Sequence, residues 1–277
     1  MYGKLSPEYQ PLVEELAASD ILELQKVDTL SATSMVTSSG TSVTHVLVSY
    51  RDELDFPMMA MHELGHYLHR TIAQEPDASN DFSIMETHST AGALLCAEDM
   101  EVYFRQLLGE QDGAFATLRY LAGTIKNLPS VLTAYAFLQE VLLNPEAYEP
   151  EDLAALYLQK SLEFGFDGGF SEAYQMMQGA SWTNEVIWTD KPGYLAAYGL
   201  GYLNALWMWY QQAQGLDMVE AYNRMLETAL PDLPQETLRR QMGLPDLTDD
   251  EAFEGLDDFV YGTLARLYRE VYQEDPL

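Results

Sequence analysis

The sequence predicts a mainly α-helical protein with a small β element near its N-terminus. Beyond Asp52, almost every segment repeats its apolar residues with the period of an α-helix, and proline or glycine separates the segments. The best candidate for a strand is VTHVLVSY at 43–50, which is rich in β-branched residues. Because no repeat and no long linker divides the chain, we expect a single domain over residues 1–277.

The elements follow one another in a simple order. A helix is predicted from Ser6-Pro7-Glu8 to about Gln25, because these three residues supply a cap, a proline in the first turn and an acidic residue. Residues 28–42 are small and hydroxylated, which predicts a loop or an irregular hairpin before the strand. Further helices are predicted at 53–72, 82–110, 112–127, 129–143, 150–164, 170–179, 194–214, 217–229, 234–241 and 249–273.

Composition indicates a folded protein without an internal disulfide. Of the 277 residues, 47% are hydrophobic and 12% aromatic, enough for a substantial core. The single cysteine, Cys96, excludes an internal disulfide, and in the apolar run AGALLCAEDM we expect a buried, inert thiol. The start MYGKLSPEYQ has no signal-peptide pattern, and no stretch approaches the roughly 18 apolar residues of a membrane span. We therefore expect a soluble, cytoplasmic protein.

The charge of the chain is strongly negative. Forty-four acidic residues against fourteen basic ones give −30, spread along the whole sequence. Such a surface disfavours binding to nucleic acid and to anionic membranes. It serves solubility, including at high salt, or it attracts cationic substrates, and we favour the first interpretation.

The stretch MHELGHYLHR at 61–70 holds three of the five histidines. His62 and His66 are four residues apart, so on a helix about 40° separates them and both imidazoles project from one face. Glu63 lies about 100° round the helix, where it can reach metal-bound water without being a ligand. This is the zincin arrangement of two histidine ligands and a general base. The alternative is a chance pattern on a solvated helix.

A catalytic zinc ion needs a third protein ligand and one open position. The segment DFSIMETHSTAGALL at 81–95 offers Asp81, Glu86 and His88. On a helix, Glu86 and His88 are about 200° apart, so they cannot both face the metal. His45, in the predicted strand, is a more remote candidate. Helical geometry alone leaves this choice open.

Several segments resemble the zinc oligopeptidases of the thimet oligopeptidase and oligoendopeptidase F family, most of all the second. THVLVSYRDELDFPMMAMHELGHYLH (44–69) is similar to the family's strand, acidic turn and active-site helix. DFSIMETHST (81–90) is similar to its third-ligand segment, whose glutamate falls on Glu86 and whose serine falls on Ser89. YLAAYGLG (194–201) resembles its tyrosine-containing, substrate-binding stretch. KLSPEYQPLVEELAASDILELQ and DDEAFEGLDDFVYGTLARLY fit the two ends of its catalytic region.

The resemblance implies a zincin-like helical catalytic domain and a zinc-dependent endopeptidase that hydrolyses short peptides. It implies one Zn²⁺ per chain, held by His62, His66 and Glu86, with Glu63 as the general base. It also assigns Tyr198, and after it Tyr194, to the hydrogen bond that stabilises the oxyanion. From the residues alone, Tyr194, Tyr198 and Tyr202 are only a helical core stripe.

The sequence departs from the family pattern in three places, and the missing channel wall and the missing histidine favour a second hypothesis. The sequence begins after the family's N-terminal segment, so we expect the channel wall that this segment provides in the family to be missing. The family's histidine before the tyrosines is missing from NEVIWTDKPGYLAAYGLG, and the loop DTLSATSMVTSSG lacks the usual basic residue. The chain would then be a degenerate homologue that binds zinc and peptides with little turnover, although the intact Glu63 argues against it. Without the channel wall, we expect either a homodimer or weaker exclusion of large substrates. A purely structural helical scaffold is a third, weaker possibility.

The remaining candidates have plain structural interpretations. We expect His69 to be packed or solvated rather than supporting a ligand, and His88 to be a hydrogen-bonded structural residue. Ser89 follows Glu86 by one helical turn and could orient a ligand. LNALWMWYQQ (203–212) is expected to lie in the core, and the glycines of FGFDGGF (164–170) to lie in a loop.

Overall fold

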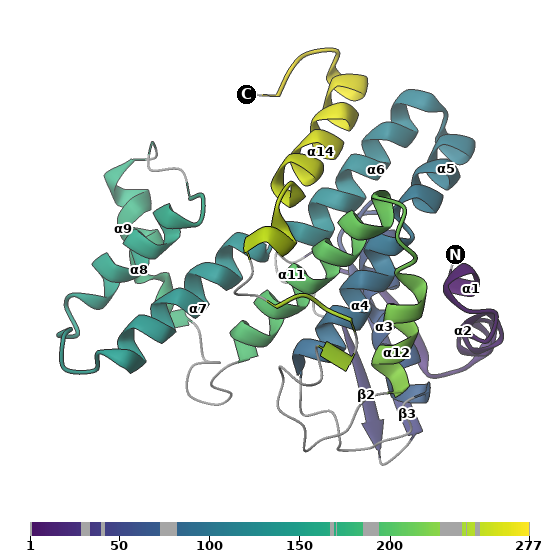
Figure 1. Ribbon diagram of the computed structural model, residues 1–277, viewed down its shortest axis with the longest axis horizontal. Helices are drawn as coiled ribbons and strands as arrows, with labels where there is room; N and C mark the ends of the chain where they lie inside the picture. Colours follow the sequence, from purple (N-terminus) through teal and green to yellow (C-terminus); the bar gives the residue numbers. More distant parts are fainter. Residues whose placement is uncertain are drawn as a thin grey trace. The chain divides into compact units, whose positions relative to one another are not determined.

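The computed structural model confirms a mainly helical fold with a small sheet near the N-terminus (Figure 1). No helix among its described residues is long and apolar enough to cross a membrane. The structure describes residues 2–28, 34–39, 42–72, 82–166, 169, 171–184, 194–227, 240–241, 243–246 and 250–276.

Contacts within the chain divide it into two compact units. Unit 1 comprises residues 1–125 and 201–277, and unit 2 comprises residues 126–200. The boundary falls inside helix α11 (Tyr194–Ala213), whose first turns belong to unit 2. The expectation of a single catalytic domain over the whole chain stays a prediction.

Unit 1 begins with helices α1 (Tyr2–Leu5) and α2 (Tyr9–Ala18) and strand β1 (Leu22–Lys26). The predicted helix to Gln25 is therefore wrong in its last part. Helix α2 ends where the Ser19 amide and hydroxyl both bond to the carbonyl of Leu16. The following residues pair in parallel with a later strand, and this distant pairing decides their conformation against local helical propensity.

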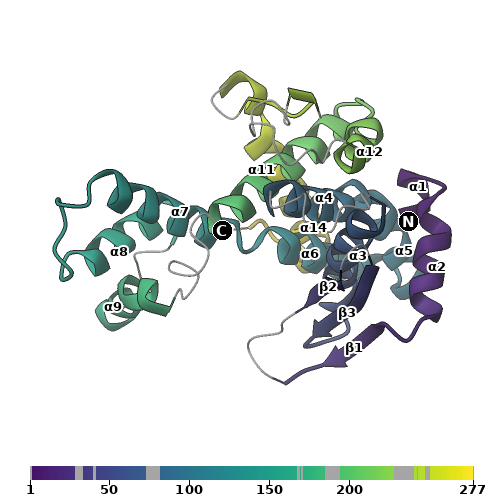
Figure 2. The same cartoon turned by 90° about the horizontal axis from the view of Figure 1, so that it is seen from below.

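The sheet has three strands in the order β1–β3–β2, as Figure 2 shows from below. Strand β2 (Met35–Ser39) runs antiparallel to β3 (Ser42–Tyr50), with an irregularity between Thr37 and Ser38. The predicted irregular hairpin and the predicted strand at 43–50 are thus confirmed for the described residues. Val46 and Val48 of β3 are buried, and helix α3 packs against this strand.

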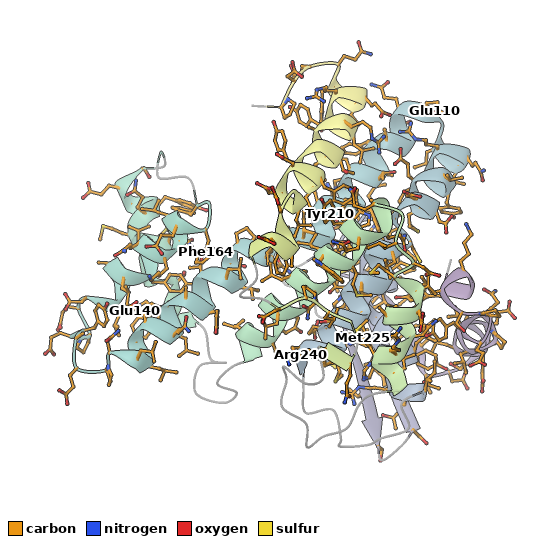
Figure 3. The ribbon with its side chains drawn as sticks, in the orientation of Figure 1. Glu110, Glu140, Phe164, Tyr210, Met225 and Arg240 are labelled. Atoms are coloured by element: carbon orange, nitrogen blue, oxygen red, sulfur yellow. The ribbon has the colours of Figure 1, made fainter. Side chains whose placement is uncertain are left out.

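Helix α4 packs against four other helices of unit 1. The bounds are α3 Phe56–Ile72, α4 Phe82–Leu95, α5 Ala97–Leu108, α6 Glu110–Ile125, α12 Val219–Glu227, a 3₁₀ turn η2 Asp250–Phe253 and α14 Leu256–Tyr272. Helix α4 contacts α3, α5, α6 and α12, and its side chains from Ser83 to Leu95 are all buried. Met225 of α12, labelled in Figure 3, is also buried.

Two predictions for these helices need correction or stay open. The predicted helix at 82–110 is interrupted at Cys96, where neither glycine nor proline marks the break, so local sequence gave no signal for it. Cys96 is buried, and burial raises the pKa of its thiol to about 12, as expected for an inert side chain. Of the helix predicted at 234–241, only residues 240 and 241 lie in the part that the structure describes.

Unit 2 contains α7 (Leu128–Leu143), α8 (Leu153–Glu163), α9 (Glu172–Ala180) and a 3₁₀ turn η1 (Ser181–Asn184). The helices predicted at 129–143, 150–164 and 170–179 are confirmed to within a few residues. Its core is apolar and aromatic, and its buried members are Ala134, Phe137, Leu156 and Tyr157. The rings of Phe137 and Tyr157 meet edge to face with centroids 5.2 Å apart.

Candidate metal centre

The acidic turn before helix α3 fixes the start of that helix. The Oδ1 atom of Asp52 accepts hydrogen bonds from the backbone amides of Leu54 and Asp55, at 2.9 and 3.0 Å. Arg119 of α6 pairs with the carboxylates of both Asp52 and Asp55. Helix α3 then runs unbroken to Ile72, so His62 and His66 share one face, as their spacing predicts.

Two glycines bring the neighbouring helices close to α4. A Cβ atom on Gly65 would lie 2.5 Å from the Cα atom of Ser89, so only glycine allows α3 to approach α4 at this point. A Cβ atom on Gly201 of α11 would likewise lie 2.6 Å from the Cβ atom of Glu86. The turn of α4 that carries Glu86 and Ser89 is therefore held between two glycine-containing helices.

Three potential ligand atoms converge where α3 meets α4. The Nε2 atoms of His62 and His66 are 3.1 Å apart, and each lies 3.5 Å from an oxygen of Glu86. The ligand atoms of the three residues all lie within 4.8 Å of one another. Ligands at about 2.0–2.1 Å from a tetrahedral zinc ion are themselves roughly 3.3 Å apart, which matches this spacing. The group is thus arranged so that it can hold one metal ion.

The electrostatics of the group also suit a cation. Burial lowers the pKa of His62 to about 4. Burial, and next the proximity of His62, hold the pKa of His66 well below its usual value. Both imidazoles are therefore neutral at pH 7 and cannot neutralise the carboxylate of Glu86, whose side chain is 5% exposed. Two neutral imidazoles and one carboxylate form a donor set that zinc prefers.

Comparison with known proteins supports the fold of this region. No family model and no curated protein matches the sequence. Two solved structures match the chain with a TM-score of 0.71 each. One is assigned as an oligoendopeptidase F (17% identity over 95% of this chain and 46% of its own), and the other is PZ peptidase A with an inhibitor (18% identity, 97% and 48%). The chain shares the fold of these two peptidases. It spans about half the length of each.

The resemblance to oligoendopeptidase F that the sequence predicts is therefore confirmed at the level of the fold. The structure also brings together the three ligands that this resemblance implies. Of the other candidates for the third ligand, Asp81 lies outside the described residues. His45 lies in the sheet, with its Nε2 atom 3.6 Å from a carboxylate oxygen of Glu23.

His88 points away from the ligand group, as its angular separation from Glu86 predicts. Its Nδ1 atom lies 3.2 Å from the carbonyl oxygen of Gly65, and its ring stacks on Tyr222 with centroids 4.1 Å apart. His69 is buried beside it, with ring centroids 5.3 Å apart, and neither histidine takes part in the ligand group. Both are packed within the helical core of unit 1.

Glu63 lies next to the ligands and is itself 4% exposed. Burial, and then the charge of Glu86, raise the pKa of Glu63 to about 8. Among the described residues, its Oε2 atom has no hydrogen-bond partner. A carboxyl group with such a pKa is mostly protonated at pH 7, so Glu63 needs a nearby cation to hold it in the carboxylate form that a general base requires.

The three tyrosines of α11 differ in how far their side chains are buried or described. Tyr202 is buried, as expected for a core position, and Tyr198 is partly buried. The side chain of Tyr194 lies outside the described part of the chain. Tyr194 and Tyr198 belong to unit 2 and the ligand group to unit 1, so their catalytic role stays a prediction.

Sequence reasoning did not identify the two glycines or Asn204 as parts of the site. Glycine inside a helix is a signal of close approach, and Gly65 within HELGH could have been interpreted in this way. Asn204 of α11 is buried and donates a hydrogen bond to Thr87, which follows Glu86 in α4. Nothing in the sequence around Asn204 indicates this contact.

Proposed function

We propose that the chain is a zinc-dependent metallopeptidase of the thimet oligopeptidase and oligoendopeptidase F family, which hydrolyses peptide bonds in short peptides. The observation that carries this proposal is the convergence of His62, His66 and Glu86, with Glu63 beside them. The shared fold with an oligoendopeptidase F and with PZ peptidase A supports it.

The Nε2 atoms of the two histidines and the carboxylate of Glu86 would hold the zinc ion. When bound, zinc would polarise the scissile carbonyl and lower the pKa of water, so that the water could lose a proton and attack as a nucleophile. Glu63 would accept the proton of the attacking water and pass it to the leaving amine. Tyr198, with Tyr194, would donate a hydrogen bond to the developing oxyanion, a role supported by the resemblance of segment 194–201 to the family.

A degenerate homologue that binds zinc and peptides with little turnover is the second candidate. The absence of any histidine after His88 favours it, because the family's second oxyanion donor is then missing. The intact Glu63, buried next to His62, favours the enzyme, since a non-catalytic zinc site has no use for a general base. The cytoplasmic location and the homodimer expected from the sequence stay predictions.

The decisive experiment compares the wild type with Glu63→Gln. Glutamine keeps the shape of the side chain but cannot accept a proton, so cleavage of a mixed peptide pool should fall by at least ~10²-fold. Zinc should remain at about one per chain, because Glu63 is outside the ligand set. Mass spectrometry of the peptides and metal analysis of the protein give the two readings. The control is Glu53→Gln, since Glu53 is exposed and pairs with Lys26.

A second substitution tests the oxyanion donor. Tyr198→Phe removes one hydroxyl and should lower turnover by about 10²–10³-fold with zinc retained. Tyr261→Phe, at an exposed position of α14, should leave turnover unchanged. A wild type that cleaves peptides, with two inactive variants that hold zinc, supports the peptidase. A zinc-loaded wild type no faster than Glu63→Gln establishes the binding protein instead.

A further inference from the structure

A single serine hydroxyl connects two of the ligand residues. Ser89 of α4 is fully buried, and its Oγ atom donates a hydrogen bond to the backbone carbonyl of Glu86, at 3.3 Å. The same oxygen lies 3.3 Å from the Nδ1 atom of His62 on helix α3. Because a hydroxyl has one proton and two lone pairs, the oxygen that donates to Glu86 can only accept from His62.

This assignment determines which nitrogen of His62 carries the proton. If Nδ1–H donates to Ser89, the Nε2 atom has a free lone pair. That lone pair is on the atom that faces His66 and Glu86. The Nδ1 atom of His66 has no hydrogen-bond partner among the described residues. Of the two histidines in the ligand group, His62 is therefore the one whose Nδ1 atom contacts a hydrogen-bonding side chain, that of Ser89.

The contact depends on the close approach of α3 and α4. A Cβ atom on Gly65 would meet the Cβ atom of Ser89 at 3.0 Å and its Cα atom at 2.5 Å. Any larger residue at this position would push α4 away from α3, and the hydroxyl would leave the reach of His62. Gly65 therefore allows the two helices to come close enough for Ser89 to contact and orient the imidazole of His62.

We propose that Ser89 is a positioning residue for the metal centre, which holds His62 in the Nδ1–H tautomer so that Nε2 is free to bind a divalent cation. This inference rests on the metal-binding part of the proposed function. A metal-bound histidine usually donates the N–H of its other ring nitrogen to a carboxylate or a carbonyl. Here the hydroxyl of Ser89 would accept that hydrogen bond. Because a hydroxyl is neutral, it orients the ring without adding negative charge beside Glu86 and Glu63.

Zinc affinity is the first test, measured by competition with a chelator on the full chain. Ser89→Ala should weaken zinc binding by about 10–100-fold, as loss of such a supporting group does elsewhere. The matched control is Ser161→Ala in α8, where another buried serine bonds to the carbonyl of Tyr157 and accepts from Gln178. Zinc affinity of that control should stay within about threefold of wild type. Ser89→Ala with the affinity of the control would overturn the proposal.

The tautomer of His62 is the second test, and it needs neither metal nor turnover. Long-range ¹H–¹⁵N spectra of the metal-free wild type should show His62 mainly protonated at Nδ1, and Ser89→Ala should shift it towards Nε2. Identical spectra in the two proteins would overturn the proposal. A wild type that binds no zinc but shows the Nδ1–H tautomer contradicts the proposed function and leaves this contact established. A wild type that binds zinc but cleaves nothing contradicts only the peptidase.

Discussion

Unit 1 contains two clusters of charged and polar side chains that differ in one respect. On the surface, Arg105 and Arg266 interleave with Glu101 and Glu270 between helices α5 and α14, and Glu110, labelled in Figure 3, adds a further pair. Inside, two histidines and Glu86 converge between α3 and α4, with Glu63 beside them. In the first cluster every carboxylate pairs with an arginine, and the second cluster contains no arginine or lysine.

The pKa shifts express this difference. Although burial alone raises the pKa of Glu101, hydrogen bonds from Arg266 and Arg105 leave it lowered overall. Hydrogen bonds to Glu270 and Glu101 raise the pKa of Arg105 in turn. In the buried cluster, burial depresses the pKa of His62 and raises that of Glu63, so each group resists its charged form. A buried cluster of this kind is suited to a cation from outside the chain, in keeping with the proposed metal site.

The largest expected effect is that of the metal on stability. A ligand that binds only the folded state at 100 times its Kd stabilises that state by about 2.7 kcal/mol. Urea unfolding with excess zinc and with chelator should therefore differ by about this free energy. Arg105→Ala, in the surface cluster, should show the same difference in unfolding free energy between zinc and chelator. Equal stability with zinc and with chelator would contradict the comparison between the two clusters.

The next effect separates the third ligand from its neighbour. Glu86→Gln replaces an anionic ligand with a weaker, neutral one, so zinc affinity should fall by well over tenfold, which is more than about 1.4 kcal/mol. His88→Gln should leave zinc near one per chain, because the side chain of His88 faces Gly65 and Tyr222. Metal analysis after dialysis against zinc measures both. Equal loss in the two variants would show that Glu86 is not the third ligand.

These clusters also show how far the sequence could predict the site. The spacing of His62 and His66 depends only on the helix that carries them, so the sequence alone predicts their shared face. The choice of Glu86 over His88 and His45 depends on how α4 and the sheet pack against α3, and only the family resemblance indicated it. The contact between Ser89 and His62 depends on an approach that Gly65 permits, so no local pattern could establish it.

In the fold, too, local features could be predicted from the sequence, and features that depend on distant contacts could not. Long apolar helices such as α3 and α11 were predicted to within three residues at each end. Strand β1 was predicted as helix, because its conformation depends on pairing with β3 twenty-four residues further along the chain. The break at Cys96 and the division of the chain into two units likewise depend on packing between distant segments. Sequence periodicity carries no information about such contacts.

The smallest expected effect tests the surface cluster of arginines and glutamates. Arg105→Ala removes one cation, but Arg266 still bonds to both Glu101 and Glu270, so the loss in unfolding free energy should be only about 1 kcal/mol. Salt screens exposed charges, so this difference should shrink between 0.05 and roughly 0.5 M NaCl. The control is Arg224→Ala, whose exposed i,i+4 pair with Glu220 should contribute about 0.3–0.5 kcal/mol. Both variants should bind zinc as the wild type does, because neither arginine belongs to the ligand group. If Arg105→Ala weakened zinc binding as much as Glu86→Gln, the two clusters would be coupled, and the buried one could not be treated as a separate cation site.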